Sequence, residues 1–386
     1  MRIIHCCLSQ FYADNFGYQE NFLPKTHKLQ GYDVEILAST ETYIQNKLGY
    51  VEPKSYINEY GIPVLRLGYV TYLPHLVVRK LRIYNGVFEK LEDFNPHVIF
   101  LHDLQFLSIV AIARYAKINP NVKVYVDGHT DFGNSAKNWV SKNILHKMIY
   151  KWCAKKIEPF VSKFWGVTPL RVDFFKQVYG LDETKVDLLV LGLDDTEIDF
   201  SKKNEIRSKI RKSLGLEDKF VIITGGKIDQ RKKIEVLLDA VNQLKNDTVH
   251  LILFGSITGE MKSKISKLIN SPKIKYLGWI SPKEANDYFF ASDLAFFPGT
   301  HSVLWEQSIG CGIPGVFRKW EGMQHVDIGG NCLFLEGDSR SEIQEIILKI
   351  IEDKDLYNNL KKNSEEKGQE VFLYTEIAKR AIEIKN

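Results

Sequence analysis

The sequence has no long apolar run and little excess charge of either sign. No stretch approaches the roughly 20 apolar residues that a membrane-spanning helix needs. The net charge of +4 is too small to indicate a nucleic-acid-binding protein. At the amino terminus, Met1–Leu8 has the pattern of a strand and not of a signal peptide. These absences predict a soluble, cytoplasmic chain.

Cysteine is also scarce. The five cysteines are scattered and form no C-x-x-C pair; they are Cys6, Cys7, Cys153, Cys311 and Cys332. An odd number without metal-ligand spacing predicts reduced thiols in a cytoplasmic compartment, and no metal site. The adjacent Cys6 and Cys7 fall in a predicted strand, which indicates buried side chains.

Short apolar runs alternate with helical patterns through the first half of the chain. The runs are nearly continuous, which is typical of parallel strands buried on both faces of a sheet. The predicted strands are Ile3–Leu8, Val34–Ala38, Val64–Leu67, Val98–Leu101, Val122–Val126, Phe164–Thr168 and Val186–Leu191. The predicted helices are Glu20–Gln30, Arg79–Phe94 and Leu104–Lys117.

The alternation restarts after a polar stretch, Ser201–Lys212, which is predicted to be a surface helix beyond a linker. Strands are predicted at Phe220–Thr224, His250–Phe254, Ile274–Leu277, Leu294–Phe297, Gly315–Phe317 and Cys332–Leu335. Helices are predicted at about 232–245, 259–269, 282–291, 305–311 and 340–351, with a last charged helix at about Ser364–Lys385. At 386 residues the chain exceeds one typical core. We therefore predict an α/β protein of two doubly wound, Rossmann-like domains, residues 1–195 and 196–365, with 366–386 crossing back, and a ligand cleft between the domains.

The predicted strand Phe220–Thr224 breaks into Gly225 and Gly226, and a helical pattern follows. Glycine lets the backbone approach a phosphate, and a helix amino terminus attracts anions. Lys227 and Lys232 flank this turn and would neutralise charge that develops on a diphosphate leaving group. The alternative is an ordinary surface cluster, because two further cations adjoin Lys232.

A second polar loop follows the predicted strand Leu294–Phe297. Its backbone N–H groups over Gly299–Val303, which include His301, Ser302 and Val303, are candidates to contact the diphosphate. Glu306 begins the next helix, where a carboxylate could accept hydrogen bonds from ribose hydroxyls. The alternative is that Glu306 only complements the helix dipole.

Further candidates follow strands of the first half. His129 stands just past Val122–Val126, at the strand end where α/β sites form, although a lone histidine is often structural. His102 and Asp103 occupy the equivalent end of the preceding strand and are predicted to form a wall of the site. Gly17 lies in the first strand-to-helix loop, where an ordinary turn glycine is the alternative.

The segment Ala136–Phe164 combines seven lysines with one acid, Glu158, and has Trp139, Trp152 and aliphatic residues at helical spacing. Such a helix can lie on an anionic membrane surface. The alternative, which we favour, is a domain helix with solvated lysines. A second basic apolar stretch, Tyr69–Ile83, adds to the membrane interpretation.

The order of these motifs resembles the family 4 retaining glycosyltransferases of GT-B fold, over nearly the whole chain. Pro96–His102 resembles the family's PDVIHVH strand, and Leu191–Asp194 its NGVD. Gly226–Lys232 resembles the donor motif, with Lys227 in place of the usual arginine, and Gly278–Ile280 the segment that touches the base. Ala291–Pro298 is similar to the approach to the donor loop, Glu306–Pro314 resembles EAMACGxP, and Val371–Tyr374 is like the start of the last crossing helix.

The resemblance implies a hexosyltransferase-type enzyme that retains anomeric configuration, uses a nucleotide-diphosphate sugar as donor substrate and needs no metal or other cofactor. It implies that Lys227 and Lys232 hold the diphosphate, that Glu306 holds the ribose, that Trp279 and Ile280 adjoin the base, and that His129 lies near the donor sugar. The acceptor would be a glycan or lipid-linked molecule, in bacterial surface-polysaccharide biosynthesis at the inner face of the cell membrane.

One departure from the family pattern concerns position 298. The family usually has a first glutamate there, which contacts the donor sugar, but this chain has Pro298 and no acid between Asp293 and Glu306. Thr300, His301 and Ser302 are candidates to replace it. A non-catalytic sugar-nucleotide or glycan-binding module is therefore an alternative, and a sugar-nucleotide epimerase of the same two-domain shape is a weaker one.

Overall fold

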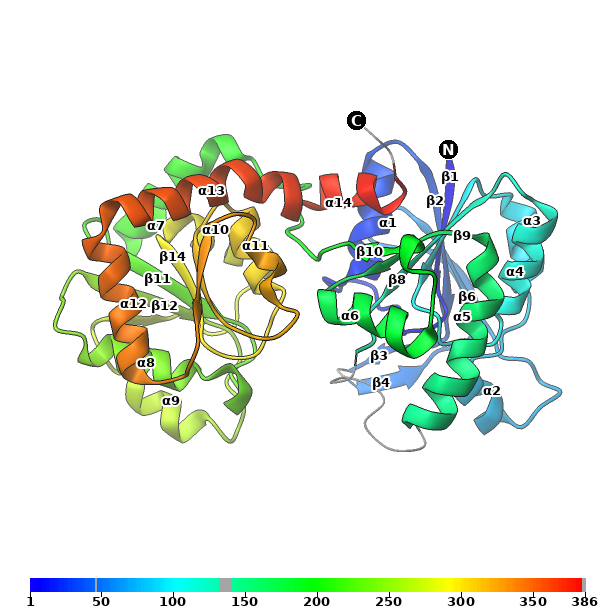
Figure 1. The fold of residues 1–386 in the computed structure, drawn as a ribbon, viewed down its shortest axis with the longest axis horizontal. Helices are drawn as coiled ribbons and strands as arrows, with labels where there is room; N and C mark the ends of the chain where they lie inside the picture. The colour runs from blue at the N-terminus through cyan, green and yellow to red at the C-terminus, as the bar shows by residue number, and fades with distance from the viewer. Residues whose placement is uncertain (46, 132–140, 384–386) are drawn as a thin grey trace. The chain divides into compact units, whose positions relative to one another are not determined.

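The computed structural model describes residues 1–45, 47–131 and 141–383. The chain divides into two compact units, each drawn around its own sheet in Figure 1. Unit 1 comprises Met1–Val190 and Ile377–Asn386, and unit 2 comprises Leu191–Glu376. The divisions thus fall after Val190 and after Glu376. The sequence instead predicts boundaries at residues 195 and 365.

Unit 1 contains an eight-stranded sheet in the order β10-β9-β8-β7-β1-β2-β6-β5. Only its edge strand β5 runs antiparallel to its neighbour β6. The strands are β1 (Arg2–Cys7), β2 (Asp33–Ser39), β5 (Lys54–Ile57), β6 (Pro63–Leu67), β7 (Val98–His102), β8 (Lys123–Gly128), β9 (Val161–Gly166) and β10 (Val186–Leu188). Seven of these were predicted from apolar runs, because both faces of a parallel sheet are covered and almost every residue of a strand is buried.

Most helices of unit 1 pack apolar residues on this sheet. The helices are α1 (Gln19–Leu29), α2 (His75–Leu81), α3 (Val87–Phe94), α4 (Ile109–Ile118), α5 (Lys151–Ile157) and α6 (Pro169–Phe174), with a π-helical segment, Ser141–Tyr150, leading into α5. Of these, α2 buries only Val78. One core cluster joins β1, β7, β8 and β9 to α3, α4 and α5. A smaller cluster joins β1, β2 and β6.

Two predictions in unit 1 were wrong. The segment predicted as one helix, Arg79–Phe94, forms α2 and α3, because Arg82 (φ 54°) and Gly86 (φ 77°) adopt left-handed conformations that end one helix and precede the next. The antiparallel hairpin of β3 (Glu41–Ile44) and β4 (Lys47–Tyr50), and the edge strand β5, were not predicted. Most of their residues are not buried, so they lack the apolar signal of the central strands.

The basic segment Ala136–Phe164 is described only in part, and Trp139 lies outside the described residues. In the described part, α5 buries Cys153 and Ile157, whereas Trp152 is 43% exposed and Met148 is 64% exposed. No helix in the described part of the chain combines the length and apolarity needed to span a membrane.

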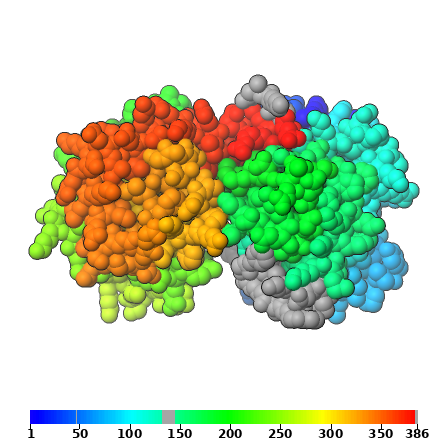
Figure 2. Space-filling model, in the orientation of Figure 1, coloured from blue at the N-terminus to red at the C-terminus, as the bar shows by residue number. Residues whose placement is uncertain are grey.

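Unit 2 contains a six-stranded parallel sheet in the order β13-β12-β11-β14-β15-β16. Its strands are β11 (Phe220–Gly225), β12 (Val249–Phe254), β13 (Ile274–Tyr276), β14 (Leu294–Phe297), β15 (Gly315–Arg318) and β16 (Cys332–Leu335). Its helices are α7 (Lys203–Leu214), α8 (Ile234–Gln243), α9 (Lys262–Leu268), α10 (Pro282–Ala291), α11 (Leu304–Gly310), α12 (Arg340–Glu352) and α13 (Lys354–Phe372). The six strands and the helices between them confirm the predicted alternation. Figure 2 shows α12 and α13, orange to red, at the surface of the unit.

The strand order of each sheet contains one reversal. In unit 1 the chain builds outward in opposite directions from the neighbouring strands β1 and β7, and in unit 2 from β11 and β14. Such a reversal separates the loops that follow the two strands, and ligands of doubly wound sheets bind in the resulting crevice. The loops after β11 and β14 are those in which the sequence places its phosphate-binding candidates.

The last predicted helix, Ser364–Lys385, was wrong as one element. The chain instead forms α13 and α14 (Tyr374–Ala381), and the residue between them, Leu373, is extended. Leu373 pairs with Leu193: the Leu193 N–H donates to Phe372 O at 2.7 Å, and the Tyr374 N–H donates to Leu193 O at 3.0 Å. These hydrogen bonds replace those that a continuous helix would make.

We predict that Gly255→Ala destabilises unit 2. Gly255 has φ +113°, and a Cβ there would lie 1.9 Å from Gly226 O. Strain and overlap together should lower the free energy of unfolding by about 2–4 kcal/mol, measured by urea denaturation. The matched control is Gly259→Ala, because a Cβ at Gly259 would meet no described atom within 4 Å. Equal stability of the two variants would contradict the prediction.

Candidate functional site

Glycine shapes the turn that follows β11. Gly226 has φ +101°, a conformation that side chains disfavour, and its N–H donates to Phe254 O at 3.1 Å. A Cβ on Gly225 would lie 2.6 Å from the Phe254 ring. Both positions therefore need glycine, and the turn brings the backbone of β11 directly beside the end of β12.

The loop after β14 lies against this turn. Gly299 packs on the backbone of Arg231 and Lys232, so that a Cβ on Gly299 would lie 2.3 Å from Arg231 O. The Thr300 N–H donates to the same carbonyl at 3.0 Å. The close approach of the two loops thus depends on Gly299, which the sequence places in the predicted diphosphate loop.

Lys232 joins the two loops through its side chain. Its Nζ donates to Thr300 O and to His301 O, both at 2.8 Å. Burial lowers the pKa of Lys232 to about 8. Lys227, the other predicted cation, is exposed.

Lys227 lies at the wall of a pocket of about 410 Å³ in unit 2. The pocket is also lined by Gly226, Phe254, Gly255, Ser256, Ile257, Thr258, Trp279 and Ile280. The structure therefore places four of the predicted residues around one hollow. Trp279 is 72% exposed, so its ring is available to a planar ligand.

Glu306 is completely buried at the start of α11. Its Oε1 accepts hydrogen bonds from His301 Nε2 at 2.7 Å and from His325 Nε2 at 2.8 Å. Its Oε2 has no hydrogen-bond partner among the described residues. Burial alone would raise the pKa of Glu306, but the two histidines outweigh burial and hold the pKa below its usual range.

His325 was not predicted from the sequence. It lies 19 residues beyond Glu306, in the short 3-10 helix Gln324–Val326 between β15 and β16, and no motif spacing links the two residues. His301 was selected for its backbone, yet its side chain also contacts Glu306. Ser302 and Val303, which complete the predicted loop, are half-buried between Thr300 and α11.

Two groups of side chains bring three metal-ligand atoms within 4.8 Å of one another: His301, Glu306 and His325, and Glu20, His102 and His129. In the first group, the nitrogens lie 2.7 and 2.8 Å from the Glu306 oxygen. Ligands of a tetrahedral zinc ion would lie ~3.3 Å apart, so hydrogen bonding explains this geometry better. In the second group, both nitrogens of His102 are already engaged.

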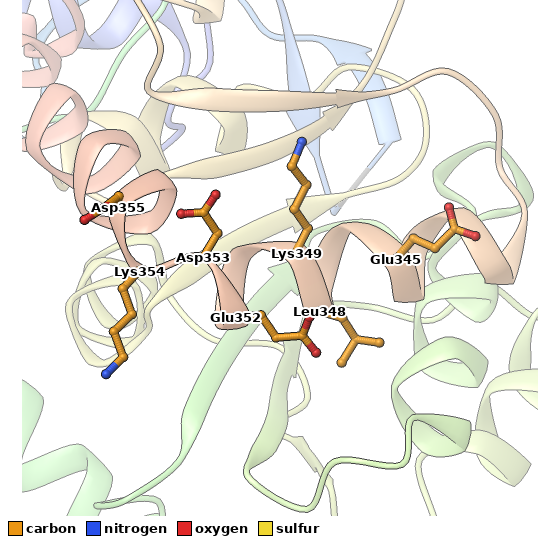
Figure 3. A pocket seen from close by; sticks show the side chains of 7 residues that line it. All are labelled: Glu345, Leu348, Lys349, Glu352, Asp353, Lys354 and Asp355. Carbon is orange, nitrogen blue, oxygen red and sulfur yellow. The ribbon is translucent and has the colours of Figure 1, made fainter.

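Unit 2 also has a wide hollow of about 800 Å³ beside the end of α12. It is lined by Glu345, Leu348, Lys349, Glu352, Asp353, Lys354 and Asp355, and Figure 3 shows these side chains pointing in different directions. Charged groups that do not converge form no site, so we place the candidate site at the β11 and β14 loops.

In unit 1, His129 follows β8 as predicted. Its Nε2 lies 3.4 Å from Asp127 Oδ2. Burial alone would lower the pKa of His129, but the carboxylates of Asp127 and Glu20 outweigh burial and raise the pKa to about 9. The structure thus makes His129 a cation at neutral pH. Gly17 lies in the loop between β1 and α1, where a Cβ would lie 3.2 Å from the Phe22 ring.

His102 and Asp103, which the sequence predicts as a wall of the site, are fully buried, so their side chains do not face an open site in this structure. The Asp103 carboxylate accepts hydrogen bonds from Gln105 Nε2 and Leu104 N at 2.8 Å and from Thr130 Oγ1 at 2.9 Å. His102 Nδ1 lies 2.8 Å from Asp127 Oδ2. The pair supports the ends of β7 and β8 from within unit 1.

Comparisons with known proteins agree with this geometry. Residues 206–367 match the family model described as Glycosyl transferases group 1. Mannosylfructose-phosphate synthase of Agrobacterium fabrum is 22% identical over 258 residues, which are 62% of this chain and 55% of the synthase. The chain therefore spans about half the length of that relative.

Solved structures match nearly the whole chain. A glycosyltransferase from Rickettsia africae has a TM-score of 0.68 at 13% identity, covering 99% of this chain and 97% of that one. HepE of Anabaena, solved in complex with UDP, has a TM-score of 0.66 at 17% identity, covering 99% of both chains. The chain has the GT-B fold, and together the matches support a GT-B glycosyltransferase.

We predict that Glu306→Gln destabilises the protein in a pH-dependent way. The pKa of Glu306 is lower in the folded state than its usual value of 4.5, so its stabilisation is present above pH 4.5 and is lost as pH falls further. Glutamine removes the charge, which should cost about 1–3 kcal/mol at pH 7. Urea denaturation at several pH values measures the difference from wild type, which should shrink in acid.

The control for this prediction is Glu205→Gln, at an exposed position of α7. It should leave stability within about 0.5 kcal/mol of wild type at every pH. A Glu306→Gln penalty that persists undiminished below pH 4 would contradict the charge-based explanation.

Proposed function

We propose that this protein is a retaining glycosyltransferase that moves a sugar from a nucleotide-diphosphate donor to a glycan or lipid-linked acceptor. The observation that carries the proposal is the meeting of two glycine-dependent loops at the β11/β14 reversal, where Lys232 bridges the loops and Lys227 lines a pocket. The match of residues 206–367 to a glycosyltransferase family model supports it.

Lys232 is suited to bind the diphosphate. An ammonium group has three N–H donors, and two of those of Lys232 are used on the carbonyls of Thr300 and His301. The third remains for a phosphate oxygen. When the bond between the sugar and the diphosphate breaks, negative charge grows on the departing oxygen, and a cation already held in place stabilises it without reorganisation.

The pocket lined by Trp279 and Ile280 would receive the base of the nucleotide. HepE of Anabaena was solved with UDP, which supports testing a uridine nucleotide first. Because Glu306 is fully buried behind His301 and His325, contact with a ribose requires that His301 move aside. His301 is the side chain we assign to the donor sugar, in place of the acid that Pro298 replaces.

In unit 1, His129 is proposed to face the donor sugar as a cation. The acceptor hydroxyl would attack the anomeric carbon on the face from which the diphosphate departs, and its proton would pass to a departing phosphate oxygen. Retention of configuration follows from attack on the same face. No residue of unit 1 needs to act as a base in this scheme.

Contact with an anionic membrane is part of the proposal. In and before α2, the side chains of Tyr72 and Leu76 are 77% and 79% exposed, and Arg79 and Lys80 follow them. In the other basic segment, Met148 and Trp152 are exposed beside lysines. Exposed apolar groups among cations favour binding at a lipid surface, consistent with a lipid-linked acceptor and a setting in surface-polysaccharide assembly.

We predict that the protein binds UDP or another nucleoside diphosphate and that Lys232→Met weakens this binding at least tenfold. Isothermal titration with UDP, GDP and ADP measures the affinities, and UDP-sugars then serve as donors in a transfer assay with anomeric analysis of the product by NMR. Lys262→Met, at an exposed position of α9, is the control. Binding without transfer to any acceptor would favour the non-catalytic alternative.

We predict that nucleotide affinity falls as pH rises. The pKa of Lys232 in the free protein is lowered to about 8, so the ammonium is present at pH 7 and is largely lost at pH 9.5. A bound diphosphate favours the charged form, and affinity should therefore drop several-fold between these values. Lys232→Arg, which stays charged, should show a flatter profile. A flat wild-type profile would contradict the assignment.

A further inference from the structure

Unit 1 contains a continuous chain of buried imidazoles that the proposed reaction does not use. His27 of α1, His5 of β1 and His102 of β7 are each fully buried. His27 Nε2 lies 2.9 Å from Ala378 O, His27 Nδ1 lies 3.0 Å from His5 Nε2, and His5 Nδ1 lies 3.1 Å from His102 Nε2. His102 Nδ1 then lies 2.8 Å from Asp127 Oδ2. Every ring nitrogen of the three histidines is thus within hydrogen-bond distance of another polar atom of the chain.

The two ends of this chain accept hydrogen bonds and cannot donate them. Asp127 is a carboxylate whose pKa is held below its usual range: burial would raise it, but His102 and His129 outweigh burial. Ala378 O is a carbonyl of the last turn of α14, where helix carbonyls lack a partner within the helix, and Ala378 is fully buried. The carbonyl of Ala381, at the end of the same helix, accepts a hydrogen bond from Trp165 Nε1 at 3.0 Å. Figure 1 shows α14, in red, beside α1.

The number of protons follows from these contacts. The chain has four contacts, one at each end and two between imidazoles, and each needs one hydrogen. Three neutral imidazoles bring only three hydrogens. With three, two lone pairs would face each other at one contact, fully buried and without compensation, which is costly.

We propose that this chain of three histidines holds a fourth proton. His102 is then an imidazolium that donates hydrogen bonds to Asp127 and to His5. His5 and His27 are neutral, and each donates through Nε2 in the direction of Ala378 O. All four contacts are then satisfied. His5 and His27 become positioning residues that tie the last turn of α14 to the charge state of the Asp127 carboxylate.

Several observations place the charge on His102 and not elsewhere in the chain. Burial lowers the pKa of His5 well below its usual value and lowers that of His27 to about 4. His102 alone among the three contacts a carboxylate, and Glu20 of α1 lies within 4.8 Å of His102 and His129. Two carboxylates, Asp127 and Glu20, are then matched by two imidazolium ions, His102 and His129.

Other ionisable groups near the three histidines either have partners of their own or stay neutral. Asp103, after β7, is held by its own hydrogen bonds from Gln105 and Thr130. Burial raises the pKa of Cys7 on β1 well above its usual value, so this thiol stays neutral. Arg66 of β6 is bound to the carbonyls of Ser39 and Tyr12, and Arg171 of α6 pairs with Asp131.

The protonation of the three histidines is linked to His129 through the shared carboxylate of Asp127. Asp127 Oδ2 lies 2.8 Å from His102 and 3.4 Å from His129, so it serves both rings. If α14 withdrew Ala378 O, one acceptor would disappear and three neutral imidazoles would suffice. Seating of α14 and uptake of one proton are therefore coupled, and by linkage each favours the other. That His129 lies near the donor sugar rests on the proposed function, but the number of protons on the three histidines does not.

The test compares wild type with His27→Phe and His27→Gln. Phenylalanine removes the contact to Ala378 O, so that His5 and His102 can satisfy the remaining contacts as neutral rings that donate through Nδ1. Glutamine is the conservative variant, since its amide can donate to Ala378 O and accept from His5. The readout is the protonation of each histidine nitrogen at pH 7, from two-bond ¹⁵N–¹H spectra of ¹⁵N-histidine-labelled protein, assigned with single variants.

In wild type and His27→Gln we expect both nitrogens of His102 to be protonated and His5 to be the Nε2–H tautomer. In His27→Phe we expect a neutral His102, with Nδ1–H tautomers at both His102 and His5, and faster amide exchange in the last turn of α14. Three neutral rings in wild type, or an imidazolium that persists in His27→Phe, would overturn the proposal. The wild-type spectrum decides the count even where a variant fails to fold, and it decides it whether or not the protein transfers sugar.

Discussion

A buried carboxylate shared by two histidines organises the candidate residues of each unit. In unit 2, Glu306 Oε1 accepts from His301 and His325, and in unit 1, Asp127 Oδ2 lies between His102 and His129. A buried charge is costly unless it is paired and hydrogen-bonded. Moving a histidine away would leave the buried carboxylate with fewer hydrogen bonds, which is unfavourable. The histidines therefore hold the loops around the strand ends in place. Much of the local geometry depends on these two pairings.

Glycine sets how closely the loops of unit 2 approach. Gly226, Gly255 and Gly299 lie where a Cβ would overlap backbone or a neighbouring side chain, or where φ is positive. The turn after β11 and the loop after β14 can therefore share hydrogen bonds through Arg231 and Lys232. Because Lys232 bridges the two loops, its ammonium group is partly desolvated, and this burial lowers its pKa to about 8.

The sequence predicted most central strands because burial on both faces leaves an unbroken apolar run, as in Phe220–Gly225. It could not predict β3 and β4, whose residues are mostly outside the core, or the break at Arg82, where a residue other than glycine adopts a left-handed conformation. Motif order placed Lys227, Lys232, Trp279 and Glu306 in one predicted domain, and all four lie in unit 2. It could not find His325, His5 or His27, because their partners are fixed by strand order and not by spacing in the chain.

The replacement of an acid by Pro298 has a physical consequence for the donor loop. Pro298 is buried at the end of β14, and Gly299 follows against the Arg231 carbonyl, so the loop presents backbone groups and the His301 imidazole in place of a carboxylate. The Glu306 carboxylate is hydrogen-bonded by His301 and His325, and Arg231 is paired with Asp229. Lys227 and Lys232, and Arg318 at the end of β15, place cations at this edge of the sheet. Under the proposed function, an acid beside these cations would repel a diphosphate while binding sugar hydroxyls. This loop would attract the diphosphate without that repulsion and would contact the sugar through backbone groups and His301.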